Sequence, residues 1–378
     1  MRFTPEDIIR KFEDAAGPLP NSWITKWKET GKVVGYFCCY IPDEIIHAAN
    51  MLPVRITARG HKETTYGDAY LSRLNCASAK YILDKALQKG FDFLDGLVAF
   101  NSCDHMRRLY DNWKYKVKTP YLHFLSVPHH VDDNALDWFV KELKNFKESL
   151  EKHFQIQITE EKLKASIQVY NEMRRLLTEL YDLRKSEAPK FSGVEALTIT
   201  TAATAIPKED FNKMLEQYLK EITNREGIEG KPRLMLIGSI LDDPSYVKII
   251  EDLGGLVVTD SLCFGTRYFA NMPDTLEDPL ENLAAKYLRK SPCPRMIDSG
   301  SDFKVRQKYM LNMIKEFHVD GVILETMKFC DFWTAERFMM EEPFKELDIP
   351  FLTLEREYIT TNVGQMKTRV QAFLEVLE

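Results

Sequence analysis

The segment Leu94-Asp-Gly-Leu-Val-Ala-Phe-Asn-Ser-Cys103-Asp-His joins a continuous apolar run to a cysteine and then to a helical pattern. A short apolar run without polar alternation is typical of a strand that is buried on both faces, as in a parallel sheet. A similar arrangement occurs in Val322-Ile-Leu-Glu-Thr-Met-Lys-Phe-Cys330. Both cysteines are therefore predicted at the carboxyl ends of strands, where open α/β sheets bind their ligands.

Strand and helix signals continue on the amino-terminal side. The apolar run Val33–Ile41 predicts a strand that ends before a proline, and the pattern from about Cys76 to Lys89 predicts a helix closed by Gly90. A further strand is predicted over Tyr121–Val127, between two prolines. Together with an amphipathic helical lead, these elements predict a first α/β domain over residues 1–133.

The rest of the chain divides into a helical segment and a second α/β segment. Residues 134–231 carry apolar side chains at helical spacing and predict a helical connector, within which the stretch Ile199–Ile206 has no clear assignment. Four apolar runs within residues 232–378 predict parallel strands, beginning near Arg233, Leu256, Val319 and Ile349. The predicted fold class is α/β, with two Rossmann- or flavodoxin-like parallel-sheet domains joined by the connector.

Composition limits the classes of function. The chain has 378 residues, enough for two or three domains with cores of their own. Its net charge of -6 gives no basic footprint, which argues against nucleic acid as a partner. No run of about 18 apolar residues occurs and the first residues predict a helix, so we expect a cytoplasmic protein with no membrane partner. Seven cysteines at wide spacings do not indicate a disulfide framework.

Three of the cysteines share a local context. Cys76, Cys103 and Cys330 each precede a helical pattern, and a helix N-terminus stabilises a thiolate. We therefore predict an iron–sulfur cluster on these residues at the interface of the two α/β domains, with Cys263 as a fourth metal ligand or a supporting group. Two alternatives remain: the thiols are inert buried groups, or they bind zinc with His105, although no CxxC pair occurs.

Four segments spread over nearly the whole chain form a specific combination. They are Gly35–Arg55, Asn101–Asp111, Asp320–Glu325 followed by Cys330, and Gly364–Phe373. This combination resembles the benzoyl-CoA reductase and 2-hydroxyacyl-CoA dehydratase family, that of the 2-hydroxyglutaryl-CoA dehydratase D-component. Within the family, Phe91–Arg108 and Leu122–His129 are most similar to the smaller catalytic subunit of ATP-dependent benzoyl-CoA reductases.

The resemblance implies a [4Fe–4S] cluster held by Cys76, Cys103 and Cys330. It also implies a homologous larger catalytic subunit, a benzoyl-CoA or other acyl-CoA substrate, and electrons delivered one at a time by a separate ATP-hydrolysing iron–sulfur activator. The absence of a GxxxxGK[ST] loop agrees with ATP hydrolysis in another protein. The implied reaction is a dearomatising reduction. The alternatives are radical elimination of water by a 2-hydroxyacyl-CoA dehydratase, an electron-relay subunit without substrate, and a small-molecule reductase of the same fold.

The resemblance also draws attention to the end of the first strand. Dehydratase subunits carry there a serine that contacts the substrate hydroxyl, whereas this chain has Cys38 and Cys39. We predict these two cysteines and His105 as catalytic residues, with His105 as a proton donor because imidazole titrates near neutrality. His129 and His130 are alternative donors.

Two further sets of side chains are predicted around the cluster. If the substrate is aromatic, its pocket is expected to carry few charges and to be lined by aromatic residues, namely Tyr36, Phe37, Tyr40, Phe264 and Trp333. Six basic residues either bind the CoA moiety or form a solvated basic face, namely Arg55, Arg59, Lys62, Arg107, Arg108 and Lys114.

Overall fold

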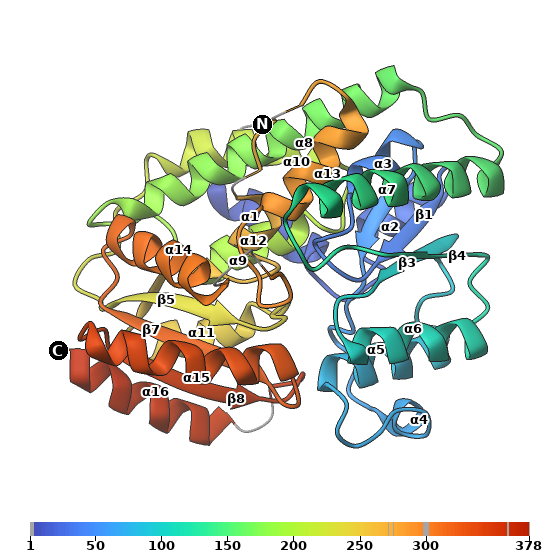
Figure 1. The fold of residues 1–378 in the computed structure, drawn as a ribbon. Coiled ribbons are helices and arrows are strands. Elements are labelled where there is room, and N and C mark those ends of the chain that lie inside the picture. Colours follow the sequence, from blue (N-terminus) through green and yellow to red (C-terminus); the bar gives the residue numbers. More distant parts are fainter. Residues whose placement is uncertain (1–3, 271, 275, 298–301, 361–362, 378) are drawn as a thin grey trace.

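The computed structural model describes residues 4–270, 272–274, 276–297, 302–360 and 363–377. Two four-stranded parallel sheets form its amino-terminal and carboxyl-terminal halves, with strand orders β2-β1-β3-β4 and β6-β5-β7-β8 (Figure 1). Both orders are of the flavodoxin type, which confirms the α/β class. The strands are β1 (Val33–Tyr36), β2 (Leu52–Arg55), β3 (Gly96–Phe100), β4 (Tyr121–Leu125), β5 (Arg233–Gly238), β6 (Leu256–Ser261), β7 (Gly321–Met327) and β8 (Phe351–Arg356).

Strand β1 is shorter than the sequence pattern predicts. The expected strand Val33–Ile41 ends at Tyr36, because the amide of Ile41 donates a hydrogen bond to the carbonyl of Cys38 at 3.0 Å and closes a turn. Cys38 and Cys39 therefore lie in a turn beyond the carboxyl end of β1 instead of alternating along a strand.

Strand β2 is missing from the predictions because it contains a proline. Pro53 has no amide hydrogen for a ladder, and a proline inside an apolar run argues against a central strand. The structure accommodates Pro53 because β2 is an edge strand that pairs only with β1.

Helices cover the sheets and fill the segment between them (Figure 1). Those of the amino-terminal half are α1 (Pro5–Ala15), α2 (Ser22–Trp27), α3 (Asp43–Ala48), α4 (Thr65–Asp68), α5 (Ala77–Leu87) and α6 (Asp104–Lys116). The connector contains α7 (Asp133–Phe154), α8 (Glu160–Asp182), the short 3-10 helix η1 (Leu183–Lys185), α9 (Gly193–Ala202) and α10 (Lys208–Ile222). The remaining helices are α11 (Ser245–Asp252), α12 (Thr266–Phe269), α13 (Pro279–Arg289), α14 (Asp302–Glu316), α15 (Asp331–Glu346) and α16 (Val363–Leu377). In the described ranges, no helix has the length and apolar character needed to cross a membrane.

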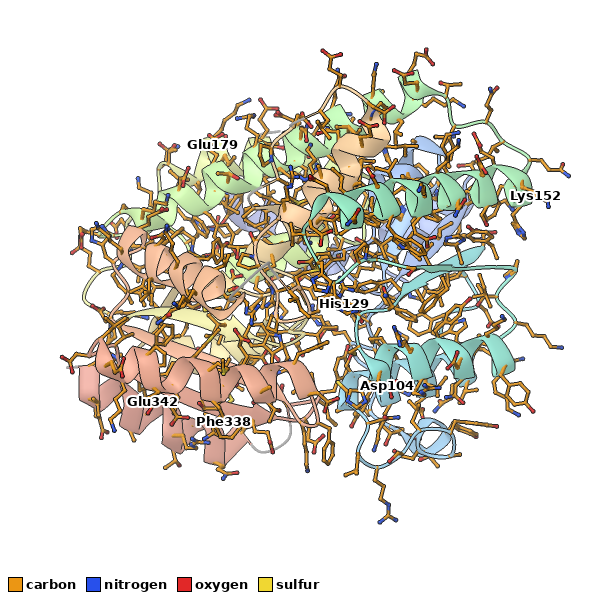
Figure 2. The ribbon with its side chains drawn as sticks, in the orientation of Figure 1. Asp104, His129, Lys152, Glu179, Phe338 and Glu342 are labelled. Carbon is orange, nitrogen blue, oxygen red and sulfur yellow. The ribbon has the colours of Figure 1, made fainter. Side chains whose placement is uncertain are left out.

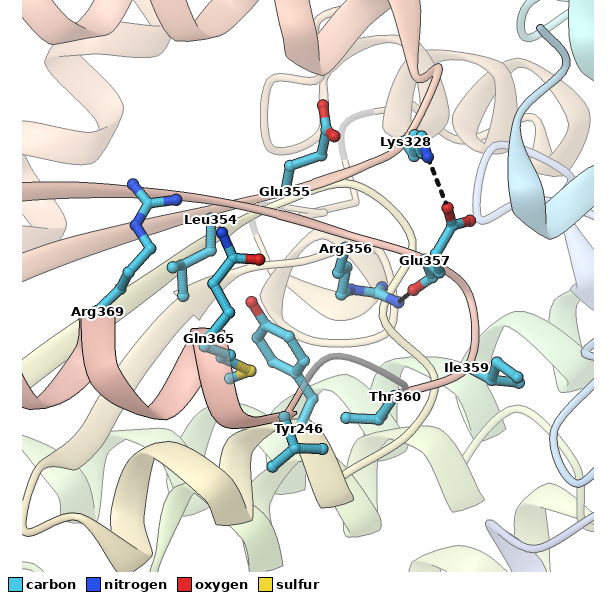
Figure 3. Close-up of a pocket in the computed structure, with 12 residues that line it drawn as sticks. Tyr246, Lys328, Leu354, Glu355, Arg356, Glu357, Ile359, Thr360, Gln365 and Arg369 are labelled. Atoms are coloured by element: carbon cyan, nitrogen blue, oxygen red, sulfur yellow. Dashed lines mark hydrogen bonds and ion pairs between the residues drawn. The ribbon is translucent and has the colours of Figure 1, made fainter.

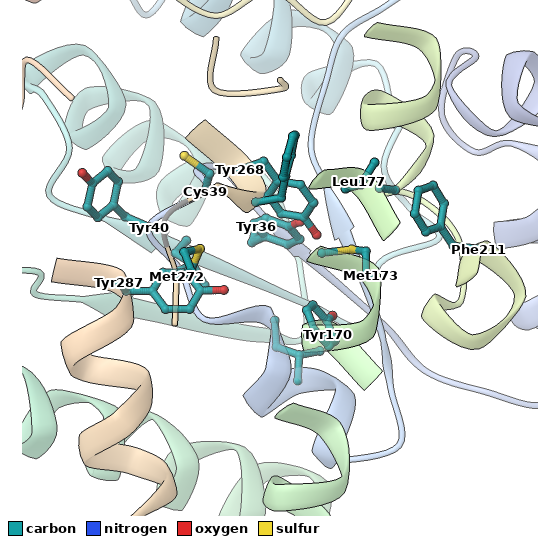
Figure 4. Close-up of a cluster of buried hydrophobic side chains, with 14 of the residues drawn as sticks. Tyr36, Cys39, Tyr40, Tyr170, Met173, Leu177, Phe211, Tyr268, Met272 and Tyr287 are labelled. Atoms are coloured by element: carbon teal, nitrogen blue, oxygen red, sulfur yellow. The ribbon is translucent and has the colours of Figure 1, made fainter. Parts of the chain in front are cut away.

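A hydrophobic cluster joins the connector helices to both halves (Figure 4). It contains Tyr36 on β1, Leu177 on α8, Phe211 on α10 and Tyr287 on α13, all of them buried. Burial of such side chains contributes about 1.5–3 kcal/mol each, so the connector stabilises both sheets at once. The domain bounds 1–133, 134–231 and 232–378 stay a prediction.

Tyr358, which follows β8, connects the two halves directly. Its hydroxyl accepts a hydrogen bond from the amide of Ala58 at 2.8 Å and donates one to the carboxylate of Asp242. Ala58 lies beyond β2 and Asp242 lies beyond β5. The carboxyl ends of both sheets therefore face the same junction.

We expect Tyr358→Phe to lower the free energy of unfolding by about 1–3 kcal/mol, because the buried amide of Ala58 and the buried carboxylate of Asp242 each lose their partner. Urea denaturation measures the change. Tyr115→Phe is the matched control, since Tyr115 is 77% exposed and should tolerate the loss of its hydroxyl. Equal stability of the two variants would contradict a structural role for the Tyr358 hydroxyl.

Candidate functional site

The three predicted cysteine ligands occupy equivalent positions in the fold. Cys76, Cys103 and Cys330 are the N-cap residues of α5, α6 and α15. Cys103 also follows β3, and Cys330 follows β7, so both lie beyond the carboxyl end of a strand. None of the three side chains accepts a capping hydrogen bond, but amides of the first helical turns lower the pKa of each thiol. These amides are those of Ser78 and Ala79 for Cys76, those of His105 and Met106 for Cys103, and that of Trp333 for Cys330.

A tight turn brings Cys330 to the start of its helix. The amide of Cys330 donates to the carbonyl of Met327 at 2.9 Å, and Phe329 adopts a left-handed conformation with φ of 63°. This conformation is uncommon for a side chain of that size, and it reverses the chain between β7 and α15.

His105 links the three segments that carry these cysteines. It lies two residues after Cys103, and its Nδ1 is hydrogen-bonded to the Oδ1 of Asn75, next to Cys76, at 3.0 Å. Its Nε2 is 3.1 Å from the Oδ2 of Asp331, next to Cys330, although without the alignment of a hydrogen bond. Segments from both halves therefore converge on one imidazole.

The thiols at this junction influence one another. Burial raises the pKa of Cys76 to about 12, and the charge of Cys103 contributes to the increase. Burial raises the pKa of Cys330 well above its usual value, and Cys76 and Cys103 raise it further. Burial likewise raises the pKa of Cys103. A cationic metal centre among the three sulfurs would offset both effects, since coordination favours the thiolate form.

The donor set has the chemistry of an iron–sulfur site. Thiolates are the usual ligands of such clusters, and all three thiols are half-buried. Among the described residues, no three His, Cys, Asp or Glu side chains are grouped tightly enough to hold a single metal ion. Ligands of a cluster bind different iron atoms, so their sulfurs are farther apart than those of a zinc site. The chemistry of these three donors fits an iron–sulfur cluster.

Cys38, Cys39 and Cys263 lie together in a different group. Nη2 of Arg55 donates to Sγ of Cys263 at 3.0 Å, and the same guanidinium acts on both Cys38 and Cys39. A hydrogen bond between Cys38 and Cys39 raises the pKa of Cys38 and lowers that of Cys39. The role of Cys263 as a fourth metal ligand, and the catalytic roles of Cys38, Cys39 and His105, stay predictions.

The predicted aromatic residues are surrounded by more charge than expected. In three of them, the charged end of a buried basic side chain lies over the ring. The guanidinium of Arg55 is 3.7 Å from the ring centroid of Phe264, and that of Arg267 is 4.7 Å from the ring centroid of Trp333. Over Tyr40, Lys290 and Arg295 lie 4.4 Å and 5.3 Å from the ring centroid. These three rings therefore have buried positive charge beside them, because aromatic faces attract cations, and a substrate pocket with few charges stays a prediction. The other two lie elsewhere, with Phe37 packed against Trp113 and Tyr36 donating to Asp43.

Sequence reasoning missed Arg267, Lys290 and Arg295. Charged residues are usually exposed, and these three are not among the six basic residues singled out above. A signal was nevertheless available, because Arg267 follows Cys263 by four residues and Arg295 follows Cys293 by two.

The six basic residues do not form one site. Arg55 is buried, whereas Arg107, Arg108 and Lys114 are exposed on α6. Arg59 and Lys62 line a cavity of about 360 Å³ together with Asp242 and Asp243.

A neighbouring cavity of about 300 Å³ lies between β8 and α16 (Figure 3). Its lining includes Lys328, which pairs with Glu357 at 3.0 Å, and also the charged side chains of Glu355 and Arg369. The lining therefore carries charges of both signs.

The alternative histidines have different environments. Nδ1 of His129 is hydrogen-bonded to the carbonyl of Arg295 at 2.8 Å, and burial lowers the pKa of this imidazole. His130 is exposed. Figure 2 labels His129 and also Asp104, which lies at the end of α6 nearer to the carboxyl-terminal half. The backbone of His130 forms a β-bridge with Ile297, so both histidines lie beside a segment of the carboxyl-terminal half.

Comparison with known proteins agrees with this geometry. The profile of the family described as 2-hydroxyglutaryl-CoA dehydratase, D-component, matches residues 38–377. The chain belongs to this family. It is 31% identical to a benzoyl-CoA reductase subunit of Thauera aromatica, over 96% of the chain and 95% of that protein.

Two further members of the family are dehydratase subunits. The chain is 28% identical to the (R)-phenyllactyl-CoA dehydratase beta subunit of Clostridium sporogenes, over 95% of the chain and 96% of that protein. It is 25% identical to the beta subunit of (R)-2-hydroxyglutaryl-CoA dehydratase of Acidaminococcus fermentans, over 98% and 99%. Relatives of this D-component family member therefore include both reductase and dehydratase subunits.

We expect His105→Ala to loosen the contact between the cysteine-bearing segments, because Asn75 and Asp331 lose their shared neighbour. In metal-free protein, alkylation of Cys76, Cys103 and Cys330 by iodoacetamide should become several-fold faster, as followed by mass spectrometry. His130→Ala is the control, since His130 is exposed. Unchanged alkylation rates in His105→Ala would contradict the linking role of the imidazole.

Proposed function

We propose that Cys76, Cys103 and Cys330 hold a [4Fe–4S] cluster and that the chain is the smaller catalytic subunit of an ATP-dependent benzoyl-CoA reductase. The observation that carries the cluster is the convergence of three N-cap thiols around His105. The reductase assignment is supported by the 31% identity to the benzoyl-CoA reductase subunit of Thauera aromatica, over nearly the full length of both chains.

The residues around the three thiols have distinct proposed roles. A [4Fe–4S] cluster of low potential would supply single electrons to a CoA thioester. The N-termini of α5, α6 and α15 lower the pKa of the three thiols and would stabilise their negative charge. His105 is the proposed proton donor, and the turn with Cys38 and Cys39 is proposed to contact the substrate.

The proposed reaction needs further proteins. The relatives are subunits of larger enzymes by their names, and this chain has no GxxxxGK[ST] loop for ATP. We therefore propose a homologous larger catalytic subunit and a separate ATP-hydrolysing iron–sulfur activator as partners. Free thiols that bind iron require a reducing compartment, which supports a cytoplasmic location.

A 2-hydroxyacyl-CoA dehydratase is the second candidate function. The relatives from Clostridium sporogenes and Acidaminococcus fermentans match the chain over the same length at 28% and 25% identity. The cluster, its three ligands and the activator would be the same in both enzymes, so the substrate alone separates the two proposals.

Replacing any one of Cys76, Cys103 and Cys330 with alanine should remove the cluster. Iron content after anaerobic purification should fall from about four atoms per chain to well below one, together with the visible thiolate-to-iron absorption. Cys293→Ala is the control and should keep its iron. Full iron content in any of the three ligand variants would contradict the assignment of that ligand.

The substrate can be tested with the purified chain, its partner subunit, activator, ATP and a low-potential reductant. We expect benzoyl-CoA to be reduced to a non-aromatic product, as followed by loss of its ultraviolet absorption. A 2-hydroxyacyl-CoA should remain unchanged in a parallel reaction. Elimination of water from that thioester, with benzoyl-CoA left intact, would identify the enzyme as a dehydratase and refute the reductase proposal.

A further inference from the structure

Four buried basic side chains near the junction lack an acidic partner. Arg55, Arg267, Lys290 and Arg295 are only 1%, 2%, 4% and 3% exposed, and we call them the cation cluster. In the described part of the chain, none of the four forms an ion pair with Asp or Glu. A buried charge without a counter-charge is strongly unfavourable. The cation cluster therefore differs from an ordinary surface patch.

Several other buried basic residues of this chain have carboxylate partners. Arg306 pairs with Glu336 at 2.7 Å, and Arg356 pairs with Glu325 at 2.7 Å. Buried basic residues such as Arg184 and Lys85 also donate only to backbone carbonyls. The cation cluster differs from these in bringing four such residues to the same thiols and aromatic rings.

Backbone carbonyls fix the cation cluster in position. Nη2 of Arg267 donates to the carbonyl of Gly238 at 2.8 Å, and Lys290 donates to the carbonyl of Cys39. Arg295 donates to the carbonyl of Val127 at 3.0 Å, and Arg55 donates to that of Cys263. Carbonyl dipoles orient these groups without cancelling their charge, so the site is preorganised for an anion.

The four cations act on a shared set of thiols. Cys39 is acted on by Lys290, Arg55 and Arg267, and Cys293 by Arg267 and Arg295. The pKa of Cys39 is lowered, first by its hydrogen bond with Cys38 and then by these cations, whereas burial raises the pKa of Cys293. The four cations and these thiols therefore share one electrostatic environment.

Several donors of the cluster have no acceptor among the described residues. They are Nε of Arg55, Nε and Nη1 of Arg267, Nε of Arg295 and the hydroxyl of the adjacent Tyr40. A buried donor without an acceptor is unfavourable, and more so when it is charged. An oxyanion carries several acceptor atoms and would satisfy more of these donors than a halide would.

A cavity borders this region at Lys290 and Tyr40. Its volume is about 340 Å³, and its lining includes Tyr40 and Lys290, which are buried, and Arg289 and Val305, which are exposed. The cavity admits a small ligand.

We propose that Arg55, Arg267, Lys290 and Arg295 form a buried binding site for a small oxyanion, either an organic carboxylate or an inorganic oxyanion. The site lies beside the thiols of Cys39, Cys263 and Cys293 and is separate from the three N-cap cysteines. It does not depend on the proposed reductase activity.

Calorimetric titration of the anaerobically purified protein, at constant ionic strength in chloride, tests the proposal. Sodium sulfate and sodium acetate are the two probes, and we expect one of them to bind saturably with one site per chain. Tighter binding of sulfate would indicate an inorganic oxyanion as the ligand, and tighter binding of acetate would indicate an organic carboxylate.

Variants connect the binding to the cation cluster. Arg267→Met and Lys290→Met should weaken binding at least about tenfold, which corresponds to the loss of a charged hydrogen bond. Arg289→Met is the matched control, because Arg289 lines the same cavity but is exposed, and it should bind within about twofold of wild type. Lys290→Arg keeps the charge and should retain binding, which separates the loss of the site from misfolding.

Three results would overturn the proposal. They are absence of saturable binding by either probe, equal weakening in Arg289→Met and Lys290→Met, and a loss of iron in Cys39→Ala. The last result would mean that a metal–thiolate group, not an oxyanion, supplies the negative charge. The titration measures anion binding and does not require turnover of a CoA thioester. A failure of the proposed reductase function would therefore be detected in a different experiment from a failure of the proposed anion site.

Discussion

Parallel strands place all their carboxyl ends at one edge of a sheet. In this protein the carboxyl edges of the two sheets face each other, and the arrangement of the candidate site depends on that junction. Cys103 emerges from β3, Cys330 from β7, and Tyr358 from β8. None of these elements could bring its side chain to the junction if the strands alternated in direction. The flavodoxin-type order also reverses between β1 and β3 and between β5 and β7, and open α/β sheets bind their ligands at such positions.

Buried charges beside this junction have different kinds of partner. Asp43 and Glu44, at the start of α3, share the hydroxyl of Tyr287, and Arg174 and Lys208 lie within reach of them from the connector. The cation cluster, in contrast, contacts thiols, carbonyls and aromatic rings. A site that binds anions gains from such an arrangement, because the charged groups are fixed in position before the ligand arrives.

Local sequence patterns predicted most of the helices and strands, whereas contacts between segments far apart in the sequence could not be predicted from them. Apolar runs are sufficient to find β3 and β7, and the N-cap positions of Cys103 and Cys330 follow directly from them. Helix α9 has no clear pattern because residues 196–202 are all buried, which leaves no polar face to give a period. Strand β2 is hidden by Pro53, which only an edge position permits. The cation cluster draws Arg55 and Arg295 from segments 240 residues apart (295 − 55), and no local signal reports that proximity.

The sequence separation of the cysteines also determines how long after the first two the third is synthesised. Cys76 and Cys103 belong to the half that a ribosome makes first, whereas Cys330 follows 227 residues later (330 − 103). At about 5–20 residues per second, the first two thiols wait roughly 11–45 s for the third. During that interval they protrude from a nascent sheet that has no partner edge. Oxidants and stray metal ions therefore have their best access to this junction before the protein is complete.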